Sequence, residues 1–245
     1  MKMMIYNNLR KHDIKNTKKY RHELKFVCEE RQLIFLEARI KHICSLDSHA
    51  GSDGKYLVRS LYFDTYDDRC FYENEAGVDL RKKFRLRLYN GNADPVYLEC
   101  KETVHGLKSK DICQLTTQQC RQLMYNQPVT GILPEQELLK RFLAERSTQL
   151  FRPKVIVEYT RTPYIHAAGN VRVTFDRHIR SSSAIDHFLE NKISGRSIMA
   201  QDSHILEVKY DEELPGAIEE ILSSGQQLSR SSFSKYSLCR QYGMR

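Results

Sequence analysis

The sequence contains no long apolar run. Its most apolar short segments, such as 33–36 and 155–157, fall far below the roughly 20 residues that a membrane-spanning helix needs. Residues 3–5 are too few for the apolar region of a secretory signal, and Asn, Lys, Arg and His dominate the stretch that follows. We therefore expect no membrane segment and a cytoplasmic location.

Glycine and proline are scarce, with 11 Gly and 6 Pro among 245 residues. This scarcity excludes collagen-like and low-complexity chains, and a hydrophobic content of 40% argues against a largely disordered one. A chain of this length can bury a sizeable core without disulfides or metals. Since no Gly/Pro/Ser-rich linker divides it, we expect a basic, weakly ordered arm over 1–18 and a single domain over 19–245.

The seven cysteines are odd in number and show no CxxC spacing. A disulfide framework uses cysteines in pairs, and structural zinc sites use closely spaced ligands, so both are disfavoured. We expect reduced thiols that behave mostly as small core residues.

Positive charge is in excess, with 39 Lys and Arg against 31 Asp and Glu and a formal net charge of +8. Such an excess indicates an anionic partner. The sequence has no zinc-finger or RRM signature and no basic stripe interleaved with aromatics, which disfavours nucleic acid as that partner.

Periodicity of the apolar residues predicts the secondary structure. Alternation with period two predicts strands over 20–28, 56–64, 82–90, 96–103, 108–115, 154–162, 171–176 and 205–210. Helical spacing predicts helices over 31–44, 117–125, 134–145, 215–222 and 233–241, and the polar stretch 181–203 reads as a long loop. About eight strands with separate helices predict an α+β fold built on an antiparallel sheet or barrel.

Five of these strands repeat one arrangement, an apolar face opposite a face that mixes Arg or Lys with polar or acidic residues. The charged faces carry Arg21, Glu23, Lys25; Lys83, Arg85, Arg87; Glu99, Lys101; Arg172, Thr174, Asp176; and Glu207, Lys209. A solvated outer face is one interpretation. The other places the apolar faces under the helices and the charged faces inside a wet barrel that receives a polyanion, with carboxylates available to a divalent cation.

Glu158 and Arg161 do not fit a regular strand within this scheme. They lie three residues apart, so they face opposite sides. Either a β-bulge near Tyr159 brings both inward, or only one of them faces the interior.

Eight segments of the chain together resemble the VTC domain, the catalytic unit of the vacuolar transporter chaperone polyphosphate polymerase. They are RHELKF (21–26), VRSLYFDT (58–65), KFRLRLY (83–89), LECK (98–101), VEYTRTPY (157–164), VRVTFD (171–176), LEVKY (206–210) and SFSKYSLCR (232–240). The resemblance extends over about 19–242 and includes the wider triphosphate tunnel metalloenzyme, or CYTH-like, superfamily. It implies an antiparallel barrel that forms a basic tunnel with helices outside.

The resemblance also implies an activity and a set of site residues. The family's polymerases transfer the γ-phosphate of ATP to a growing polyphosphate chain with the help of Mn²⁺ or Mg²⁺. The positions that match its phosphate-binding tunnel are Lys25, Arg85, Arg87, Lys101, Arg161, Arg172 and Lys235, and Glu207 matches its metal-binding glutamate. Ser234 matches a further phosphate contact, and weaker matches are Arg59, Lys209, Glu23, Glu99 and Glu158.

Three of these residues also have a structural interpretation. Ser234 suits the cap of the last helix, and Lys209 suits an ion pair with Glu207. The alternative for Arg161 is that it simply follows the strand into the Thr162-Pro163 turn. Asp64 is interpreted as a turn residue.

The first strand bears on the choice between synthesis and hydrolysis. Hydrolytic members of the superfamily typically carry an ExExK pattern there, and this sequence has Arg21 at the position of the first Glu. One carboxylate fewer favours holding a phosphate polymer, so we expect a polymerase that binds ATP and polyphosphate. A tripolyphosphatase or nucleoside triphosphatase, and a non-catalytic phosphoanion-binding module, remain alternatives. A membrane-bound partner is left open.

Overall fold

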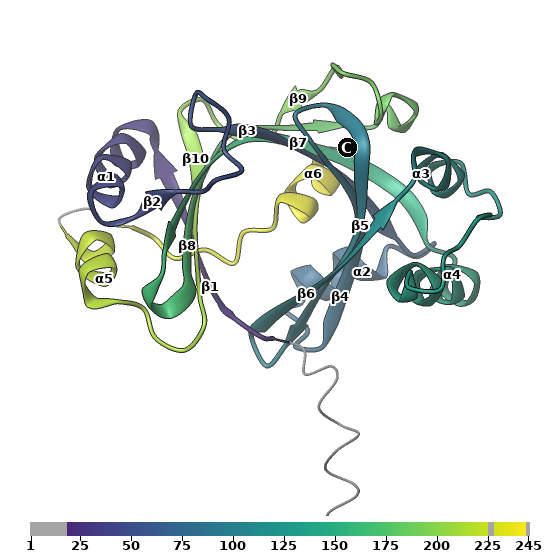
Figure 1. The fold of residues 1–245 in the computed structure, drawn as a ribbon, viewed down its shortest axis with the longest axis horizontal. Helices are drawn as coiled ribbons and strands as arrows, with labels where there is room; N and C mark the ends of the chain where they lie inside the picture. The colour runs from purple at the N-terminus through teal and green to yellow at the C-terminus, as the bar shows by residue number, and fades with distance from the viewer. Residues whose placement is uncertain (1–18, 225–227, 244–245) are drawn as a thin grey trace, which may run out of the picture.

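A computed structural model describes residues 19–224 and 228–243 of the chain. The arm predicted over 1–18 lies outside the described residues. Within them, ten strands form one sheet and six α-helices pack around it, which confirms the predicted α+β fold (Figure 1).

Eight long strands form the continuous path of the sheet, in the order β1-β10-β8-β7-β3-β4-β5-β6, and each pairs antiparallel with its neighbour. Two short strands lie off this path, β2 against β7 and β9 against β8. Their bounds are β1 His22–Glu29, β2 Ser45–Leu46, β3 Tyr56–Asp64, β4 Arg81–Tyr89, β5 Asn92–Val104, β6 Leu107–Leu115, β7 Arg152–His166, β8 Val171–Ser182, β9 Arg196–Ser197 and β10 Ser203–Tyr210.

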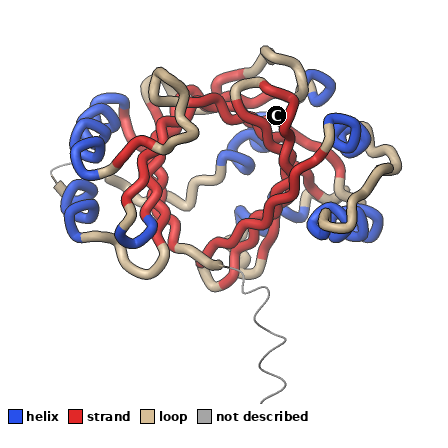
Figure 2. The backbone as a smooth tube through the Cα atoms, viewed as in Figure 1, coloured by secondary structure: helices blue, strands red, loops and turns tan. Residues whose placement is uncertain are grey.

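The sheet curls until its two end strands meet. Arg21, just before β1, forms an antiparallel bridge with Lys108 of β6, and their backbones exchange two hydrogen bonds of 2.9 Å. Seen along the view of Figure 2, the strands therefore form a ring. The curling gives the sheet an inner face, which points into the ring, and an outer face.

Helices cover the outer face on two sides of the ring (Figure 1). Their bounds are α1 Glu30–Ile43, α2 Arg69–Glu75, α3 Thr117–Met124, α4 Glu137–Gln149, α5 Gly216–Ser223 and α6 Lys235–Gly243. Helices α1 and α5 pack on one side, and α3 and α4 on the opposite side. Helix α6 instead lies within the outline of the ring and contacts β7, β8 and α2.

The apolar strand faces supply two hydrophobic cores. One joins α1 and α5 to the sheet and includes Leu33 of α1 with Val173 and Val208, and the other includes Phe84 of β4 and Phe142 of α4. The ring centroids of Phe84 and Phe142 lie 4.7 Å apart. Because apolar side chains occupy the outer face, the alternating charged side chains point inward, as the barrel interpretation predicted.

Three local features differ from the expectations. Helix α2 was not predicted; the Asp64 carboxylate accepts hydrogen bonds from the backbone N–H groups of Cys70 and Phe71 and so supports its first turn. Strand β8 continues to Ser182, through a bulge in which His178 has a φ of 54°. The expected 181–203 loop contains the short strand β9.

No helix in the described residues combines the length and the apolar character needed to cross a membrane.

Candidate functional site

The inner face gathers charged side chains from β1, β4, β5, β6, β7, β8 and β10 and from the start of α6. Basic residues outnumber carboxylates there. These side chains form three clusters. In each cluster, buried carboxylates pair with Lys and Arg side chains from more than one strand or helix.

The first cluster joins β7, β8, β10 and α6. Arg161 Nε and Nη2 donate to the two oxygens of Asp176 at 2.6 and 2.7 Å. Lys235 Nζ lies 2.7 Å from Asp176 Oδ2 and 2.7 Å from Glu207 Oε1. Burial alone would raise the pKa of Glu207, but Lys235, Lys25 and Lys209 lower it well below its ordinary value. Both carboxylates are therefore anionic at neutral pH.

The second cluster surrounds Glu23 on β1. Lys101 Nζ lies 2.8 Å from Glu23 Oε1, Lys25 Nζ lies 3.4 Å from Oε2, and Lys209 Nζ lies 3.4 Å from Oε1. Burial opposes ionisation of Glu23, yet these three lysines hold its pKa well below 4.5. Lys209 also lies 3.8 Å from Glu207, so the predicted pair between these two residues is present but loose and links this cluster to the first.

The third cluster surrounds Glu99 on β5. Arg85 Nη2 lies 2.6 Å from Glu99 Oε2, Arg87 Nη1 lies 3.5 Å from the same oxygen, and Lys110 Nζ lies 3.2 Å from Oε1. Despite burial, the two arginines and Lys110 lower the pKa of Glu99. The arginines also donate to uncharged partners, Arg85 to the Tyr62 hydroxyl at 2.7 Å and Arg87 to Ser60 Oγ at 3.0 Å.

Two further predicted residues lie beside these clusters. Arg172 is bonded to Asp47 at 2.8 Å and to the Tyr56 hydroxyl at 3.1 Å, and a third of its side chain is exposed. Ser234 Oγ accepts the backbone N–H of Ser237 at 3.3 Å, which fits the helix-cap interpretation, and it also accepts from Lys83 at 3.2 Å. Ser234 therefore both caps α6 and faces the basic side chains.

Arg59 and Glu158 do not join the other predicted residues. Both lie on the outer face, because their strand neighbours Ser60 and Tyr159 contact Arg87 on the inner face. Arg59 Nε donates to Glu158 Oε2 at 2.7 Å, and the same guanidinium donates to the backbone carbonyls of 188, 190 and 191. This pair fastens the loop after β8 to the outside of the sheet.

The same register resolves the Glu158 and Arg161 alternative. Arg161 faces inward and Glu158 faces outward, which is the second of the two interpretations. The irregularity opposite Tyr159 is in β8, where two residues, His178 and Ile179, lie opposite the single residue Tyr159.

Arg21 contributes less positive charge to the inner face than its sequence position suggests. Its Nε lies 2.9 Å from Asp211 Oδ1, and Lys19 lies 2.6 Å from the other oxygen of that carboxylate. The replacement of the first Glu of the ExExK pattern thus removes a carboxylate, while Asp211 partly balances the charge that Arg21 adds.

Sequence reasoning did not select Asp176, Tyr159 and Lys83 for the site. Asp176 has no exposed surface and is the shared partner of Arg161 and Lys235. Its place in the alternation with Arg172 and Thr174 was the signal that could have identified it. Tyr159 gave no such signal: its hydroxyl accepts from Arg87 at 3.3 Å, and Lys235 Nζ lies 5.0 Å from its ring centroid.

A divalent cation of the kind that the family resemblance implies would need oxygen donors, which Mg²⁺ and Mn²⁺ prefer. Glu207 and Asp176 offer buried carboxylate oxygens, and Lys235 now spans them. In the described part of the chain, no three acidic, His or Cys side chains group as a ready ligand set. The residues therefore fit a cation that takes most of its ligands from phosphate, with Glu207 and Asp176 as the protein donors.

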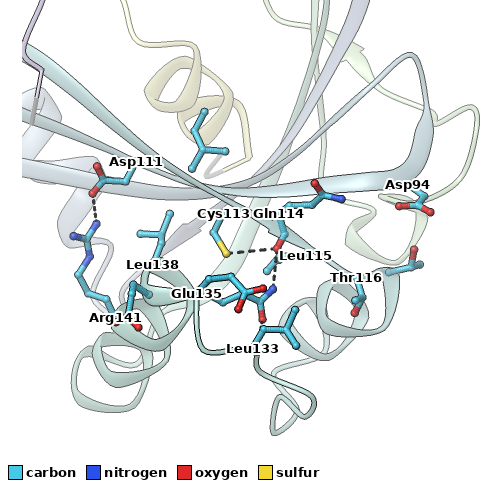
Figure 3. Close-up of a pocket in the computed structure, with 14 residues that line it drawn as sticks. Asp94, Asp111, Cys113, Gln114, Leu115, Thr116, Leu133, Glu135, Leu138 and Arg141 are labelled. Atoms are coloured by element: carbon cyan, nitrogen blue, oxygen red, sulfur yellow. Dashed lines mark hydrogen bonds and ion pairs between the residues drawn. The ribbon is translucent and has the colours of Figure 1, made fainter. Parts of the chain in front are cut away.

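A cavity of about 1240 Å³ lies elsewhere, beside β6, α3 and α4 (Figure 3). Asp94, Asp111 and Glu135 are among the residues that line it, and Arg141 bonds Asp111 at 2.7 Å. None of the predicted site residues lines this cavity, so we do not assign the chemistry to it.

Comparison with solved structures places the fold among known ones. HpAC1 from Hippeastrum, an adenylyl cyclase candidate reported to have a dominant triphosphatase activity, matches with a TM-score of 0.55 at 15% identity, over 91% of this chain and 96% of that one. An adenylate cyclase candidate from Bacillus halodurans matches with a TM-score of 0.51 at 16% identity, over 84% and 90% of the two chains. At these identities the likeness shows the fold alone.

Comparison of sequences identifies the family. No curated protein matches the chain at a significant level. The family model described as the VTC domain matches residues 20–242, which is nearly the whole chain and includes every residue of the three clusters. The protein therefore belongs to the VTC-domain family.

Proposed function

We propose that this chain is a polyphosphate polymerase that transfers the γ-phosphate of ATP to a growing polyphosphate chain with a divalent metal, Mn²⁺ or Mg²⁺. Family membership supports polyphosphate or triphosphate chemistry in general. The observation that carries the proposal is the convergence of Arg161, Lys235, Asp176 and Glu207 on the inner face, next to the lysines around Glu23.

Phosphoryl transfer depends mainly on positioning the phosphates and neutralising their charge. Arginine forks bind phosphate oxygens in pairs, and lysines add compact charges. In this proposal Arg85, Arg87, Lys25 and Lys101 bind the oxygens of the donor and acceptor phosphates. Arg161 and Lys235 neutralise charge that develops on the transferred group. The carboxylates between the cations keep them apart and positioned before the substrate arrives.

When bound, the divalent cation would neutralise phosphate charge and orient the transferred group. Glu207 and Asp176 would hold it. Lys235 Nζ, which lies between the two carboxylates, would then be free to donate to a phosphate oxygen. Arg172, which is partly exposed beside Asp47, and Ser234 at the start of α6 are proposed as additional phosphate contacts.

The choice of polymerase over hydrolase rests on Arg21, which occupies the position of a carboxylate in the hydrolytic pattern. Because Arg21 pairs with Asp211, the relevant difference is the missing acidic ligand. A site with fewer acidic ligands holds its metal more through phosphate, which favours a phosphate acceptor over water.

The test is to incubate the purified chain with ATP and Mn²⁺ and to resolve the products on a polyacrylamide gel stained for polyphosphate. We expect a ladder of long chains together with ADP. Orthophosphate without a ladder would replace the polymerase with a triphosphatase. The absence of any turnover, with tight tripolyphosphate binding, would leave a phosphate-binding domain that lacks catalysis.

A variant assigns the activity to the inner face. Glu207→Gln keeps the shape of the side chain but removes its charge, so we expect the initial rate to fall by on the order of 10²–10³. Glu220→Gln, exposed on α5, is the matched control and should retain the wild-type rate. Metal-dependent turnover at the wild-type rate in Glu207→Gln would remove this residue from the site.

A further inference from the structure

Lys83 differs from the cations of the three clusters in its partners. Its Nζ donates to the Asn74 side-chain oxygen and to Ser234 Oγ, and it lies 5.3 Å from the centroid of the Tyr236 ring. Within residues 19–224 and 228–243, no carboxylate forms an ion pair with it. A half-buried ammonium group is thus surrounded by neutral partners.

The charged groups that act on Lys83 most strongly are other cations. Lys25 on β1, Arg81 on the same strand as Lys83, and Lys108 on β6 repel its charge. The nearby Cys70 thiol and Tyr236 hydroxyl stay neutral, because burial raises the pKa of each. Lys25 forms an ion pair with Glu23, and Lys108 donates to the Thr103 hydroxyl. Among the described residues Glu23 pairs with Lys25 and no carboxylate pairs with Lys83, so this corner of the inner face carries an excess of positive charge.

Such a placement is costly for an ammonium group unless an anion joins it. Burial, followed by repulsion from Lys25 and Arg81, lowers the pKa of Lys83 to about 7. Near neutral pH a large share of the Lys83 side chains is then a neutral amine, held in place by Asn74 and Ser234. A phosphate group at this position would supply the missing negative charge.

We propose that Lys83, Asn74 and Ser234 form a phosphate subsite beside the Lys235 cluster, and that its lysine takes up a proton when a phosphate group of the substrate binds. The inference rests on the proposed function and adds a specific contact to it. Its ligand is a phosphate group of a condensed phosphate, which either inorganic polyphosphate or the triphosphate of a nucleotide can provide. No covalent bond changes: Lys83 Nζ gains one proton from the buffer, and the phosphate oxygen accepts the hydrogen bond.

The subsite is assembled from three separate parts of the fold. Lys83 comes from β4, Asn74 from α2, and Ser234 from the residue that precedes α6. Helices α2 and α6 contact each other, which keeps the two neutral partners together. The lysine is thus oriented toward a ligand before the ligand is present, and only its charge state has to change.

The experiment is titration calorimetry with tripolyphosphate at pH 8, repeated in two buffers that differ in ionisation enthalpy. Proton uptake per bound ligand follows from the difference between the two enthalpies. Lys108 and Lys110, with pKa values lowered to about 8 by burial, also take up protons. The readout is therefore the difference between wild type and variants.

Two variants at the position and one control define the outcome. Compared with wild type, Lys83→Met should gain as much as about one proton fewer for each tripolyphosphate bound. It should bind tripolyphosphate roughly 10–100-fold more weakly, which corresponds to a lost charge-assisted hydrogen bond. Lys83→Arg stays charged at every pH, so it should bind without that proton uptake. Lys82→Met, on the opposite face where Lys82 pairs with Glu145 at 2.5 Å, should match the wild type in both quantities.

Two failures are distinguishable. If the wild type binds neither tripolyphosphate, ATP nor long-chain polyphosphate, the proposed function is wrong. If the wild type binds but Lys83→Met and Lys83→Arg show its affinity and its proton uptake, the subsite is wrong and the proposed function stands. A loss confined to ATP, or to the inorganic chains, identifies which source supplies the phosphate.

Discussion

Asp176 is the residue on which the first cluster depends, because it accepts from both Arg161 and Lys235 with no exposure to solvent. In Asp176→Asn the two buried cations would keep Glu207 alone as an anionic partner. Breaking a buried ion pair typically costs 3–5 kcal/mol, and we expect a loss of about this size in the free energy of unfolding, measured by urea denaturation.

Added tripolyphosphate provides the matching control for Asp176→Asn. Because phosphate oxygens can replace the missing carboxylate charge, the ligand should stabilise the variant by at least as much as it stabilises wild type. Ligand stabilisation that disappears in the variant would show that Asp176 is needed for binding and does more than balance charge.

Arg59 gives the opposite prediction, since it lies outside the clusters although the family resemblance pointed to it. Arg59→Met leaves Glu158 and three backbone carbonyls without their buried partner, so we expect the free energy of unfolding to fall by about 3–5 kcal/mol. The dissociation constant for tripolyphosphate, measured below the unfolding temperature, should not change. A tenfold weaker affinity in the folded variant would place Arg59 in the site after all.

At the scale of elements, α6 connects the clusters to the hydrophobic core. Lys235, the first residue of the helix, binds Glu207. The hydroxyl of the next residue, Tyr236, donates to the Asp64 carboxylate that supports α2. Tyr236→Phe should reduce the free energy of unfolding by about 1–3 kcal/mol, because a buried carboxylate loses a donor. Calorimetric unfolding measures this effect.

The position of Lys235 gives that experiment its second readout. If α6 is held by the Asp64 contact, Tyr236→Phe should also weaken tripolyphosphate binding. Tyr125→Phe, at an exposed tyrosine at the end of α3, is the comparison variant. Unchanged stability together with unchanged affinity in Tyr236→Phe would contradict this role.

The strands were predictable from sequence because their alternation is regular, and the cores confirm which face is apolar. Helix α2 was not predictable in the same way, because its support comes from Asp64, which precedes it by five residues and is held by Tyr236 from the far end of the chain. The extension of β8 escaped prediction because the bulge at His178 breaks the period-two pattern.

The candidate site was likewise only partly predictable from the sequence. Alternation placed Lys25, Lys101 and Glu207 on charged faces. Nothing in the spacing could reveal that Lys235 lies between Asp176 and Glu207, because that contact joins residues far apart in the chain.

For the molecule as a whole, the three carboxylate clusters predict sensitivity to acid. The pKa values of Glu23, Glu99 and Glu207 lie below their ordinary value of 4.5 in the folded chain. The unfolded chain therefore binds more protons as the pH falls below about 4.5, so the stabilisation present at neutral pH is lost through that range. Urea midpoints measured from pH 7 to pH 3 should decline most steeply below about pH 4.5.

Glu99→Gln tests that assignment. The variant cannot lose a charge at this position, so its stability should be lower than that of wild type at pH 7 and the difference should narrow toward pH 3. Parallel curves for the two proteins would show that Glu99 does not contribute to the acid response.

The rates at which the seven cysteines react with a thiol reagent would report how this fold opens. All are free and buried, Cys28 and Cys44 beneath α1 and the other five in the second core. Because burial raises the pKa of each thiol, a thiol reagent in native buffer can reach one only when its part of the sheet opens. Mass spectrometry of the labelled peptides over time would then report, without any introduced probe, whether the two sides of the ring come apart together or separately.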